Sequence, residues 1–523
     1  MYSDKPAIQI LCSLLKANGI KRIVLCPGSR NAPIIESISG DSFFECYSIT
    51  DERSAGFVAL GLALEHEEPA AVCCTSGSAL LNLHSAVSEA FYRGLPFLVI
   101  SADRPQEWIG QMDGQTLPQS NVFGTLSRKS VNLPEVHTPS HHWYCNRLVN
   151  EALLALQRED VRGPVHINIP LGEPLFEFNT PTLPKERKIE WLSSPNDLRD
   201  LWREATRKLI IVGQMDSIAE ASSLSFPSSA VVIADHLSNR PHEALESRLY
   251  RYSEELRPDI VVTIGGNILS KSLKQGLRKY PPKMHWHVSP SGEVADLFMC
   301  QTHSVPLSSG VFMEIIKDEK ANDDEFSYKQ AWKSLSLIPD SDNSKKEMES
   351  EVIAEVMKHL PPQSVLHLGN SLTVRLAQHH HLSADIQARC NRGVSGIDGS
   401  LSTAVGSAIA SDKLHFVLLG DLSFFYDANA LWNAHVPQNL RVVILNNGEG
   451  RIFETLPGLQ ESASLRPFVT GVHQASAQGW VEGLGLTYIP VRRWEELEAA
   501  VGVLTTPKRD KAVVLEIFFP VSG

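Results

Sequence analysis

Long hydrophobic runs are absent from this sequence. No apolar stretch approaches the roughly 18 residues that a helix needs to span a bilayer, so we expect no stable membrane insertion. The first residues, MYSDKPAIQI, do not show the basic, apolar and small-residue order of a secretory signal. Together these two absences predict a cytoplasmic protein.

Cysteine pairs with metal-binding or redox spacing are absent as well. The eight cysteines include no CxxC, and several lie inside apolar runs that resemble strands. We therefore expect small buried core residues in a reducing compartment, and neither disulfides nor a zinc site. The histidines at 141–142 and 379–381 have no fitting carboxylate or cysteine spacing, so they do not favour zinc either.

Positive charge is scarce. The chain has 48 lysines and arginines against 60 aspartates and glutamates, and the net charge of −12 argues against bulk binding of nucleic acid or anionic membranes. If the ligand is an anion, a few local Arg and Lys side chains must meet its charge. Low-complexity tracts and short-period repeats are also missing.

The length and the pattern of apolar runs predict three domains. A chain of 523 residues with 43% hydrophobic residues is too long for one core. In the first block, strand-like apolar runs alternate with helix-sized segments such as 52–65, which is typical of a parallel, doubly wound sheet. The strands that we expect in this block are 22–26, 70–74 and 96–101.

Two further α/β blocks follow. Residues 175–205 are charged and contain proline, and residues 317–346 are polar, so we interpret both segments as linkers. The later strands are expected at 208–213, 230–235, 259–266, 364–369, 415–420, 441–446 and 512–519. The predicted fold class is α/β, with three doubly wound, mostly parallel sheets in domains 1–178, 195–320 and 348–523. Whether the first and third blocks are versions of one fold stays open.

Two oxygen-bearing residues end neighbouring strands of the third block. Asp421 follows Gly420 at the end of one apolar run, and Asn447 follows Asn446 at the end of the next. Such oxygens suit Mg²⁺, which takes few protein ligands and completes its shell with phosphates and water. An aspartate that caps a helix and an asparagine in a turn would give the same pattern without a metal.

Arginines recur in the other turns that follow strands. They lie, with nearby serines, in CPGSRNAP (Ser29, Arg30), ADRPQE (Arg104), GNSLTVR (Ser371, Arg375) and NRGVSGIDG (Arg392). Ligands of doubly wound sheets bind at the carboxyl ends of the strands. Because arginine is the preferred binder of carboxylates, four such turns in an acidic chain predict a pocket for a ligand with several carboxylates. Each turn alone would also fit a plain surface loop.

Glu52 is a further candidate for a functional residue. It begins a helix rich in small residues, TDERSAGFVALGLA, which would pack tightly against a neighbour. The helix dipole alone favours a glutamate in a first turn. A functional carboxylate is the alternative.

Taken together, the polar strings resemble one family. The following occur in this order over nearly the whole chain: CPGSRNAP, DERSAGFVALGLA, TSGSALLNL, ADRPQE, GNSLTVR, NRGVSGIDG, GDLSFFYDANALW and NNGEGRIFETLP. The Gly-Asp and Asn-Asn pair resembles the diphosphate anchor of thiamine diphosphate (ThDP) enzymes. The whole set is similar to the 2-succinyl-5-enolpyruvyl-6-hydroxy-3-cyclohexene-1-carboxylate synthases of menaquinone biosynthesis, which are ThDP-dependent transferases.

This resemblance implies a reaction and its cofactors. The enzyme would decarboxylate 2-oxoglutarate and add the succinyl unit to isochorismate in a 1,4-addition, with ThDP and Mg²⁺ or Mn²⁺. It would be a homodimer or a dimer of dimers, in which Glu52 of one subunit meets Asp421 and Asn447 of another. Glu52 would hydrogen-bond the aminopyrimidine ring of the cofactor.

The resemblance also implies the site residues. Asp421, Asn447 and the carbonyl of Glu449 would bind the metal, Gly420 and Ile397 would contact ThDP, and Glu52, Arg30 and Arg392 would be catalytic. The implied substrate contacts are Ser29, Arg30, Arg104, Gln115, Lys271, Ser371, Arg375 and Arg392, with Ile452, Phe453 and Leu456 as an apolar wall.

The loop after Asn447 departs from the pattern of this family. The family usually carries glycines here, whereas this chain has Glu449 and Arg451. The Glu449 side chain would place a carboxylate near the diphosphate unless it points outward. Arg451 could contact a carboxylate or face solvent.

Three other functions share parts of this pattern. A different ThDP-dependent 2-oxoacid decarboxylase or synthase would share Glu52, Asp421 and Asn447 but would not need so many arginines. A dinucleotide-dependent dehydrogenase is disfavoured because Gly265-Gly266-Asn267 does not complete GxGxxG. A non-catalytic regulatory protein that binds ThDP or a nucleotide would have no chemical need for Glu52.

Overall fold

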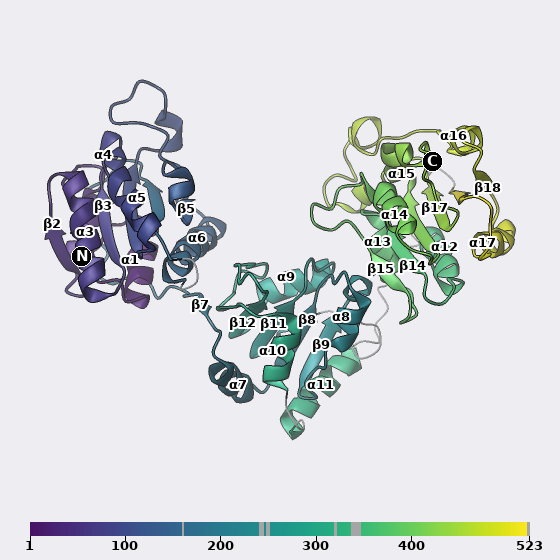
Figure 1. Ribbon diagram of the computed structural model, residues 1–523, viewed down its shortest axis with the longest axis horizontal. Helices are drawn as coiled ribbons and strands as arrows, with labels where there is room; N and C mark the ends of the chain where they lie inside the picture. Colours follow the sequence, from purple (N-terminus) through teal and green to yellow (C-terminus); the bar gives the residue numbers. More distant parts are fainter. Residues whose placement is uncertain (159–161, 240–244, 247–251, 318–321, 336–346, 520–523) are drawn as a thin grey trace. The chain divides into compact units, whose positions relative to one another are not determined.

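The computed structural model describes most of the chain (Figure 1). The described residues are 1–158, 162–239, 245–246, 252–317, 322–335 and 347–519. The chain divides into two compact units, one of residues 1–192 with 293–304 and one of residues 193–292 with 305–523. Within the described ranges, no helix is both long and apolar enough to cross a membrane.

Six parallel strands form the first sheet, in the order β2-β1-β3-β4-β6-β5. The strands are β1 (Arg22–Leu25), β2 (Glu45–Ser48), β3 (Ala70–Cys74), β4 (Phe97–Asp103), β5 (Lys129–Asn132) and β6 (Val165–Pro170). The helices around them are α1 (Pro6–Ala17), α2 (Ala32–Ser39), α3 (Glu52–His66), α4 (Ser78–Leu81), α5 (His84–Arg93) and α6 (Pro139–Gln157). The predicted strand at 70–74 is confirmed residue for residue.

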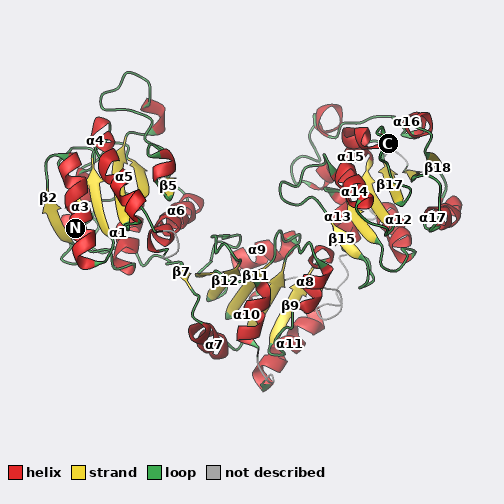
Figure 2. Cartoon of the chain, viewed as in Figure 1, coloured by secondary structure: helices red, strands yellow, loops and turns green. Residues whose placement is uncertain are grey.

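Both faces of the first sheet are buried. Ile23 and Leu25 of β1 pack into one core with α1 and α6. Val24, between them, packs into a second core with α3 and α5. Successive side chains of a strand point to opposite faces, so helices must cover both faces of the sheet, as Figure 2 shows. This is the predicted doubly wound arrangement.

The third sheet repeats the topology of the first. Its order is β15-β14-β16-β17-β19-β18, and its neighbouring strands pair in parallel. Numbered from one along the chain, the strands of either sheet read 2-1-3-4-6-5. The strands are β14 (Val365–Leu368), β15 (Gln387–Arg389), β16 (His415–Gly420), β17 (Leu440–Asn446), β18 (Thr487–Val491) and β19 (Val513–Phe518). The first and third blocks are therefore two versions of one fold, which the sequence had left open.

Helices also bury the third sheet on both faces. They are α12 (Glu347–Lys358), α13 (Leu372–Ala377), α14 (Ser400–Ile409), α15 (Asp421–Asp427), α16 (Gln478–Gly483) and α17 (Leu497–Leu504). Phe416 and Leu418 of β16 pack with α12, α13 and α17. Val417 and Leu419 face the other side, with α14 and α16. All three predicted strands at 415–420, 441–446 and 512–519 are present, the first without any shift of its ends.

The shared strand order creates a switch point in each sheet. The chain leaves β1 towards β2 on one side and reaches β3 on the other, and β14 is flanked by β15 and β16 in the same way. Ligands bind in the crevice outside the strand ends at such points. In the first sheet the two turns there are in contact, because a Cβ on Gly28 would lie 2.5 Å from the Cβ of Thr75.

The second sheet has seven strands in the order β10-β9-β8-β11-β12-β13-β7. They are β7 (Glu190–Trp191), β8 (Lys208–Val212), β9 (Ala230–Ala234), β10 (Leu245–Glu246), β11 (Ile260–Ile264), β12 (Met284–Val288) and β13 (His303–Val305). The accompanying helices are α7 (Pro195–Glu204), α8 (Ile218–Ser223), α9 (Lys271–Lys279), α10 (Ser309–Ile316) and α11 (Asp323–Leu335). With three such sheets, the predicted α/β fold class is confirmed.

Both segments interpreted as linkers contain regular structure. Residues 175–205 include β7 and all of α7, so the interpretation as a linker was wrong for the second half of this segment. In the segment 317–346, residues 323–335 form α11, whereas 318–321 and 336–346 lie outside the described residues. Tyr328 and Trp332 of α11 are buried, and the Tyr328 hydroxyl donates to the carbonyl of Leu256 at 2.9 Å. The polar residues around these two core aromatics explain why the segment was interpreted as a linker. The exact domain boundaries stay a prediction.

The eight cysteines are all free thiols. Cys46, on the edge strand β2, is exposed, and the others are buried as expected.

Candidate active site

Asp421 lies where β16 ends and α15 begins. Its side chain is 3% exposed, with Gly420 as the residue before the helix. Oδ1 accepts a hydrogen bond from the N–H of Leu422 and Oδ2 accepts one from the N–H of Gly448, both at 2.7 Å. The carboxylate therefore links the ends of the two neighbouring strands that the sequence singled out.

Asn447 follows β17 and is also buried. Its Nδ2 donates to Oε1 of Glu349 at 2.9 Å, and its Oδ1 accepts from the N–H of Glu449 at 3.0 Å. Gly448 has a φ of 74°, a left-handed backbone that glycine adopts without strain. This turn aims the Gly448 N–H at Asp421, so the loop sequence brings both predicted ligands together.

Two buried carboxyl groups lie at this loop. Burial raises the pKa of both Asp421 and Glu349, because a charged carboxylate loses its hydration there. His473 Nε2 lies 3.3 Å from Asp421 Oδ2. Within the described parts of the chain, no three His, Cys, Asp or Glu side chains converge to hold a metal. A site here would instead use one carboxylate, the Asn447 amide oxygen and a backbone carbonyl, all hard oxygen donors that fit Mg²⁺.

The two charged residues that replace glycines both lie inside this loop region. The Glu449 side chain is fully buried, and its Oε1 lies 3.3 Å from Nη2 of Arg466. Arg451 is mostly buried as well, and its Nη1 lies 3.0 Å from Oε1 of Glu349. Of the alternatives that the sequence left open, Glu449 does not point outward and Arg451 does not face solvent.

A group of basic residues surrounds the turn after β14. Arg392 is buried, and it donates from Nη1 to Asn370 Oδ1 at 2.8 Å and from Nη2 to Asn267 Oδ1 at 3.2 Å. Arg375 donates to the carbonyl of Ser371. Burial, and then the nearby charge of Arg392, lower the pKa of Arg375. Arg375 and Arg392, predicted from separate motifs, are therefore close in space.

Ser371 and Lys271 lie at the starts of two helices, α13 and α9. Ser371 occupies the N-cap position of α13, but its φ is 73° and its hydroxyl makes no capping bond. Lys271 is the first residue of α9 and is exposed. Lys274, one turn later, is partly buried, and burial followed by the charge of Arg392 lowers its pKa. Lys274 is thus the lysine of α9 next to Arg392.

Asn370 and Asn267 are further residues that the sequence reasoning missed. Each supplies an amide oxygen to Arg392. Asn370 also donates to the carbonyls of Asn391 and Gly396, both at 2.7 Å, and so holds the glycine-rich loop. A signal was available for both, because each asparagine directly follows a strand and a glycine.

The first unit holds the remaining predicted arginines. Arg30 is buried and donates from Nη1 to the Leu171 carbonyl at 2.9 Å, with Glu173 at 3.2 Å. Arg104 Nη1 lies 3.2 Å from Asp113 Oδ2. Burial, and then the nearby charge of Arg104, lower the pKa of Arg30. These two arginines from separate turns are thus neighbours, whereas Ser29 beside them is exposed.

Gln115 and the turn after β3 are also brought together. Gly77 has a φ of 81°, and a Cβ there would come within 3.1 Å of the Gln115 backbone. The Gly77 N–H donates to Oε1 of Gln119 at 2.7 Å, and Nε2 of Gln119 donates to Asn168 at 2.8 Å. Gln119 is buried, and the hydrogen bonds of its side-chain amide hold this turn in place. No sequence motif had identified this residue.

Glu52 is the first residue of α3, half-buried in the single chain. The preceding Asp51 caps the helix by accepting from the N–H of Ser54 at 2.8 Å, which leaves the Glu52 carboxylate free of that task. Burial, and then the charge of Glu52, raise the pKa of Cys26 to about 12. Glu52 therefore lies close to the residue that follows β1, at the switch point of the first sheet.

The predicted apolar contacts lie in the second unit. Ile452 and Phe453 are half-buried in a short 3-10 helix, Arg451–Thr455, and Leu456 after it is 39% exposed. Ile397 is half-buried, and its carbonyl accepts from the hydroxyl of Ser423 on α15. The loop that carries Ile397 is thereby tied to the helix that Asp421 begins.

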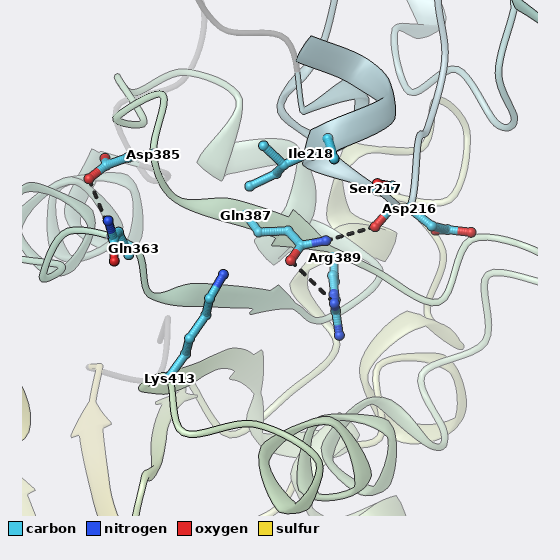
Figure 3. Close-up of a pocket in the computed structure, with 9 residues that line it drawn as sticks. Asp216, Ser217, Ile218, Gln363, Asp385, Gln387, Arg389 and Lys413 are labelled. Carbon is cyan, nitrogen blue, oxygen red and sulfur yellow. Dashed lines mark hydrogen bonds between the residues drawn. The ribbon is translucent and has the colours of Figure 1, made fainter. Parts of the chain in front are cut away.

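A separate pocket of about 740 Å³ lies in the second unit (Figure 3). Its lining from the third sheet comes mostly from residues at or just before the amino ends of strands, such as Gln363, Asp385 and Lys413. Gln387 crosses it and donates to the carbonyl of Asp216 at 2.7 Å. None of the lining residues is one that the sequence predicted. Because ligands of these sheets bind at carboxyl ends, we do not assign the active site to this pocket.

Comparisons with known proteins identify the family of this chain. Residues 7–123 match the family described as thiamine pyrophosphate enzyme, N-terminal TPP binding domain. A 2-succinyl-5-enolpyruvyl-6-hydroxy-3-cyclohexene-1-carboxylate synthase of Bacteroides thetaiotaomicron is 48% identical, over 99% of this chain and 96% of the relative. Proteins of the same name are 46% identical in Phocaeicola vulgatus, over 99% and 96%, and 37% identical in Desulfotalea psychrophila, over 90% and 91%.

The similarity extends over nearly the full length of these relatives and includes all three sheets. The chain therefore belongs to the thiamine diphosphate-dependent 2-succinyl-5-enolpyruvyl-6-hydroxy-3-cyclohexene-1-carboxylate synthase family.

Proposed function

We propose that this chain decarboxylates 2-oxoglutarate and adds the succinyl unit to isochorismate in the cytoplasm. The product is 2-succinyl-5-enolpyruvyl-6-hydroxy-3-cyclohexene-1-carboxylate, an intermediate of menaquinone biosynthesis. The observation that carries this proposal is the set of buried or partly buried basic residues beside the strand ends, in a chain with a net charge of −12. Both substrates bear two carboxylates, and arginine binds such groups in a bidentate manner.

Two oxygen ligands support a divalent metal. Asp421 Oδ1 accepts from the N–H of Leu422, Oδ2 accepts from the N–H of Gly448, and Asn447 Oδ1 accepts from the N–H of Glu449. Carboxylate and amide oxygens each have more than one lone pair, so these oxygens could also bind Mg²⁺ or Mn²⁺. The Glu449 carbonyl would be the third protein ligand. When bound to this loop and to Gly420 and Ile397, ThDP supplies the electron sink that makes loss of CO₂ possible.

The substrate contacts divide between the two units. In the first, Arg30 and Arg104 would bind carboxylates, with Ser29 and Gln115 as neutral hydrogen-bond partners. In the second, the carboxylate-binding set is Arg375, Arg392, Ser371 and Lys271. Ile452, Phe453 and Leu456 would form the apolar side of the isochorismate site. Arg30 and Arg392, both buried, would hold the reacting ends in place.

A homodimer, alone or paired into a dimer of dimers, would complete the site. Helix α3 buries small residues such as Ala55 and Ala59 and exposes large ones instead: Phe57, Val58 and Leu64 are 44%, 38% and 40% exposed. Exposed apolar faces of this kind mark protein interfaces. We infer that a second copy of the chain covers this face and brings its Asp421 and Asn447 loop to Glu52.

The direct test is CO₂ release from 2-oxoglutarate with ThDP and Mg²⁺, measured with and without isochorismate. Release that needs isochorismate and consumes it in equal amount is the expected result. Release that ignores isochorismate would instead indicate a plain 2-oxoacid decarboxylase, the second candidate, which shares Glu52, Asp421 and Asn447. Chromatography on the same sample measures the subunit number, and an active monomer would contradict the dimer.

A further inference from the structure

Glu349 contacts the proposed metal loop from a distant part of the sequence. It lies in the first turn of α12, 98 residues before Asn447, and is 2% exposed. Oε1 of Glu349 accepts from Asn447 Nδ2 at 2.9 Å and from Arg451 Nη1 at 3.0 Å. Burying an ionised glutamate costs free energy because the charge loses its hydration, and here both described contacts are on one oxygen. Such a residue is therefore a candidate for a functional role.

The contacts of Asn447 fix the orientation of its amide. An ionised carboxylate can only accept hydrogen bonds, so the nitrogen of Asn447 must face Glu349. A backbone N–H can only donate, so the oxygen must face the N–H of Glu449, which lies 3.0 Å away. Both partners require the same orientation. The amide oxygen then keeps a second lone pair that no described hydrogen bond uses.

We propose that Glu349 is a positioning residue that holds the Asn447 amide with its oxygen towards the metal. This inference rests on the proposed function, which makes Asn447 a metal ligand. Without Glu349 the amide could rotate and present its NH₂ group, which cannot bind a cation. Partners that orient metal ligands typically change metal affinity by about 10- to 100-fold when they are removed.

Arg451 and Glu349 have separable effects in this arrangement. Arg451 pairs with the same oxygen and offsets the charge of Glu349, but it does not contact Asn447 in any described hydrogen bond. Glu349→Gln keeps an acceptor oxygen that can receive both Asn447 and Arg451. We therefore expect Glu349→Gln to bind Mg²⁺ within about threefold of the native chain, and Glu349→Leu to bind it at least about tenfold more weakly.

The decisive experiment exchanges donor and acceptor between the two residues. Asn447→Asp keeps an oxygen ligand but places two carboxylates about 2.9 Å apart, so we expect Mg²⁺ affinity to fall at least about tenfold. In the double variant with Glu349→Gln, the new glutamine amide can donate a hydrogen bond to the new carboxylate at position 447. Affinity in the double variant should return to within about threefold of native, a coupling that a double-mutant cycle measures.

Calorimetric titration of the full-length chain with Mg²⁺, in the presence of a fixed excess of ThDP, gives these affinities without any turnover. The exposed Glu351 on the same helix provides the matched control, Glu351→Gln, which should bind Mg²⁺ as the native chain does. Thermal unfolding without metal separates a loss of folding from a loss of affinity. If Glu349→Leu does not fold, the double-mutant cycle of Asn447→Asp and Glu349→Gln still tests whether Glu349 orients Asn447.

Two results would overturn the inference, and they are distinguishable. Suppose that the native chain needs Mg²⁺ to bind ThDP, but that the effects of Asn447→Asp and Glu349→Gln on Mg²⁺ affinity are strictly additive. This result would refute the role of Glu349 and leave the proposed metal site standing. Binding of ThDP by the native chain without any divalent metal would refute the metal site of the proposed function, and the inference with it.

Discussion

Replacing Arg392 by glutamine should lower kcat/KM for 2-oxoglutarate by about 10- to 150-fold. Arg392 is 8% exposed, and its described hydrogen bonds run to the neutral amide oxygens of Asn370 and Asn267. Its Nε has no hydrogen-bond partner among the described residues. A hydrogen bond to a charged group contributes about 1.5–3 kcal/mol, and 1.4 kcal/mol corresponds to about tenfold, which gives the stated range.

The assay is steady-state CO₂ release at varied 2-oxoglutarate, with isochorismate held saturating. Arg389→Gln is the matched control, because Arg389 is a partly buried arginine at the end of β15 that hydrogen-bonds Ser407 and Gln387 beside the pocket of Figure 3. The control should stay within about twofold of native, as expected for a residue away from the site.

Equal losses of kcat/KM in the Arg392 and Arg389 variants would refute this reasoning, since the effect would then follow from loss of an arginine anywhere in the domain. The melting temperatures of both variants complete the test. A glutamine at position 392 can still donate to Asn370, so a large drop in melting temperature there would mean that Arg392 serves the fold instead of the substrate.

Three further outcomes are expected. Glu52→Gln should bind ThDP with native affinity in a calorimetric titration while turnover collapses, and near-native turnover would contradict the assigned role. Lys208→Met should cost about 3–5 kcal/mol of unfolding free energy in urea because it leaves the buried Glu325 unpaired, and Lys208→Met with Glu325→Met should recover most of it. Burial lowers the pKa of His166 to about 3, whereas an unfolded histidine titrates near 6.5, so below about pH 6.5 the unfolded state binds the extra proton. The unfolding free energy should therefore fall as pH drops from about 6.5 towards 3, and His166→Asn should flatten that decline; an unchanged slope would contradict the burial effect.

The sequence predicted the strands that are apolar throughout. β3 and β16 are fully or almost fully buried, and a continuous apolar run marks both of their ends. β2 was not predicted, because all of its residues are exposed at the edge of the sheet and carry no apolar pattern. α11 was missed for a related reason, since only a minority of its residues, among them Trp332, meet the core.

The candidate site was predictable where chemistry and strand ends coincide. Asp421 and Asn447 could be paired because strands of a parallel sheet end at one edge, and the structure links them through the Gly448 N–H. Glu349 offered no such signal, since it is one glutamate among several in an acidic helix start, EMESE. Lys274 was likewise invisible, because only its partial burial beside Arg392 distinguishes it from Lys271.

The strand order has a consequence for folding during synthesis on the ribosome. In the first sheet β6 lies between β4 and β5, so β5 has its neighbour only after β6 has been made. β5 ends at Asn132 and β6 begins at Val165, and at about 5–20 residues per second the interval lasts a few seconds. In the third sheet β18 waits for β19 in the same way. In each of the two domains the strand that is made last lies between two strands that are made earlier, so a translational pause just before β6 or β19 would prolong the exposure of an unpaired sheet edge.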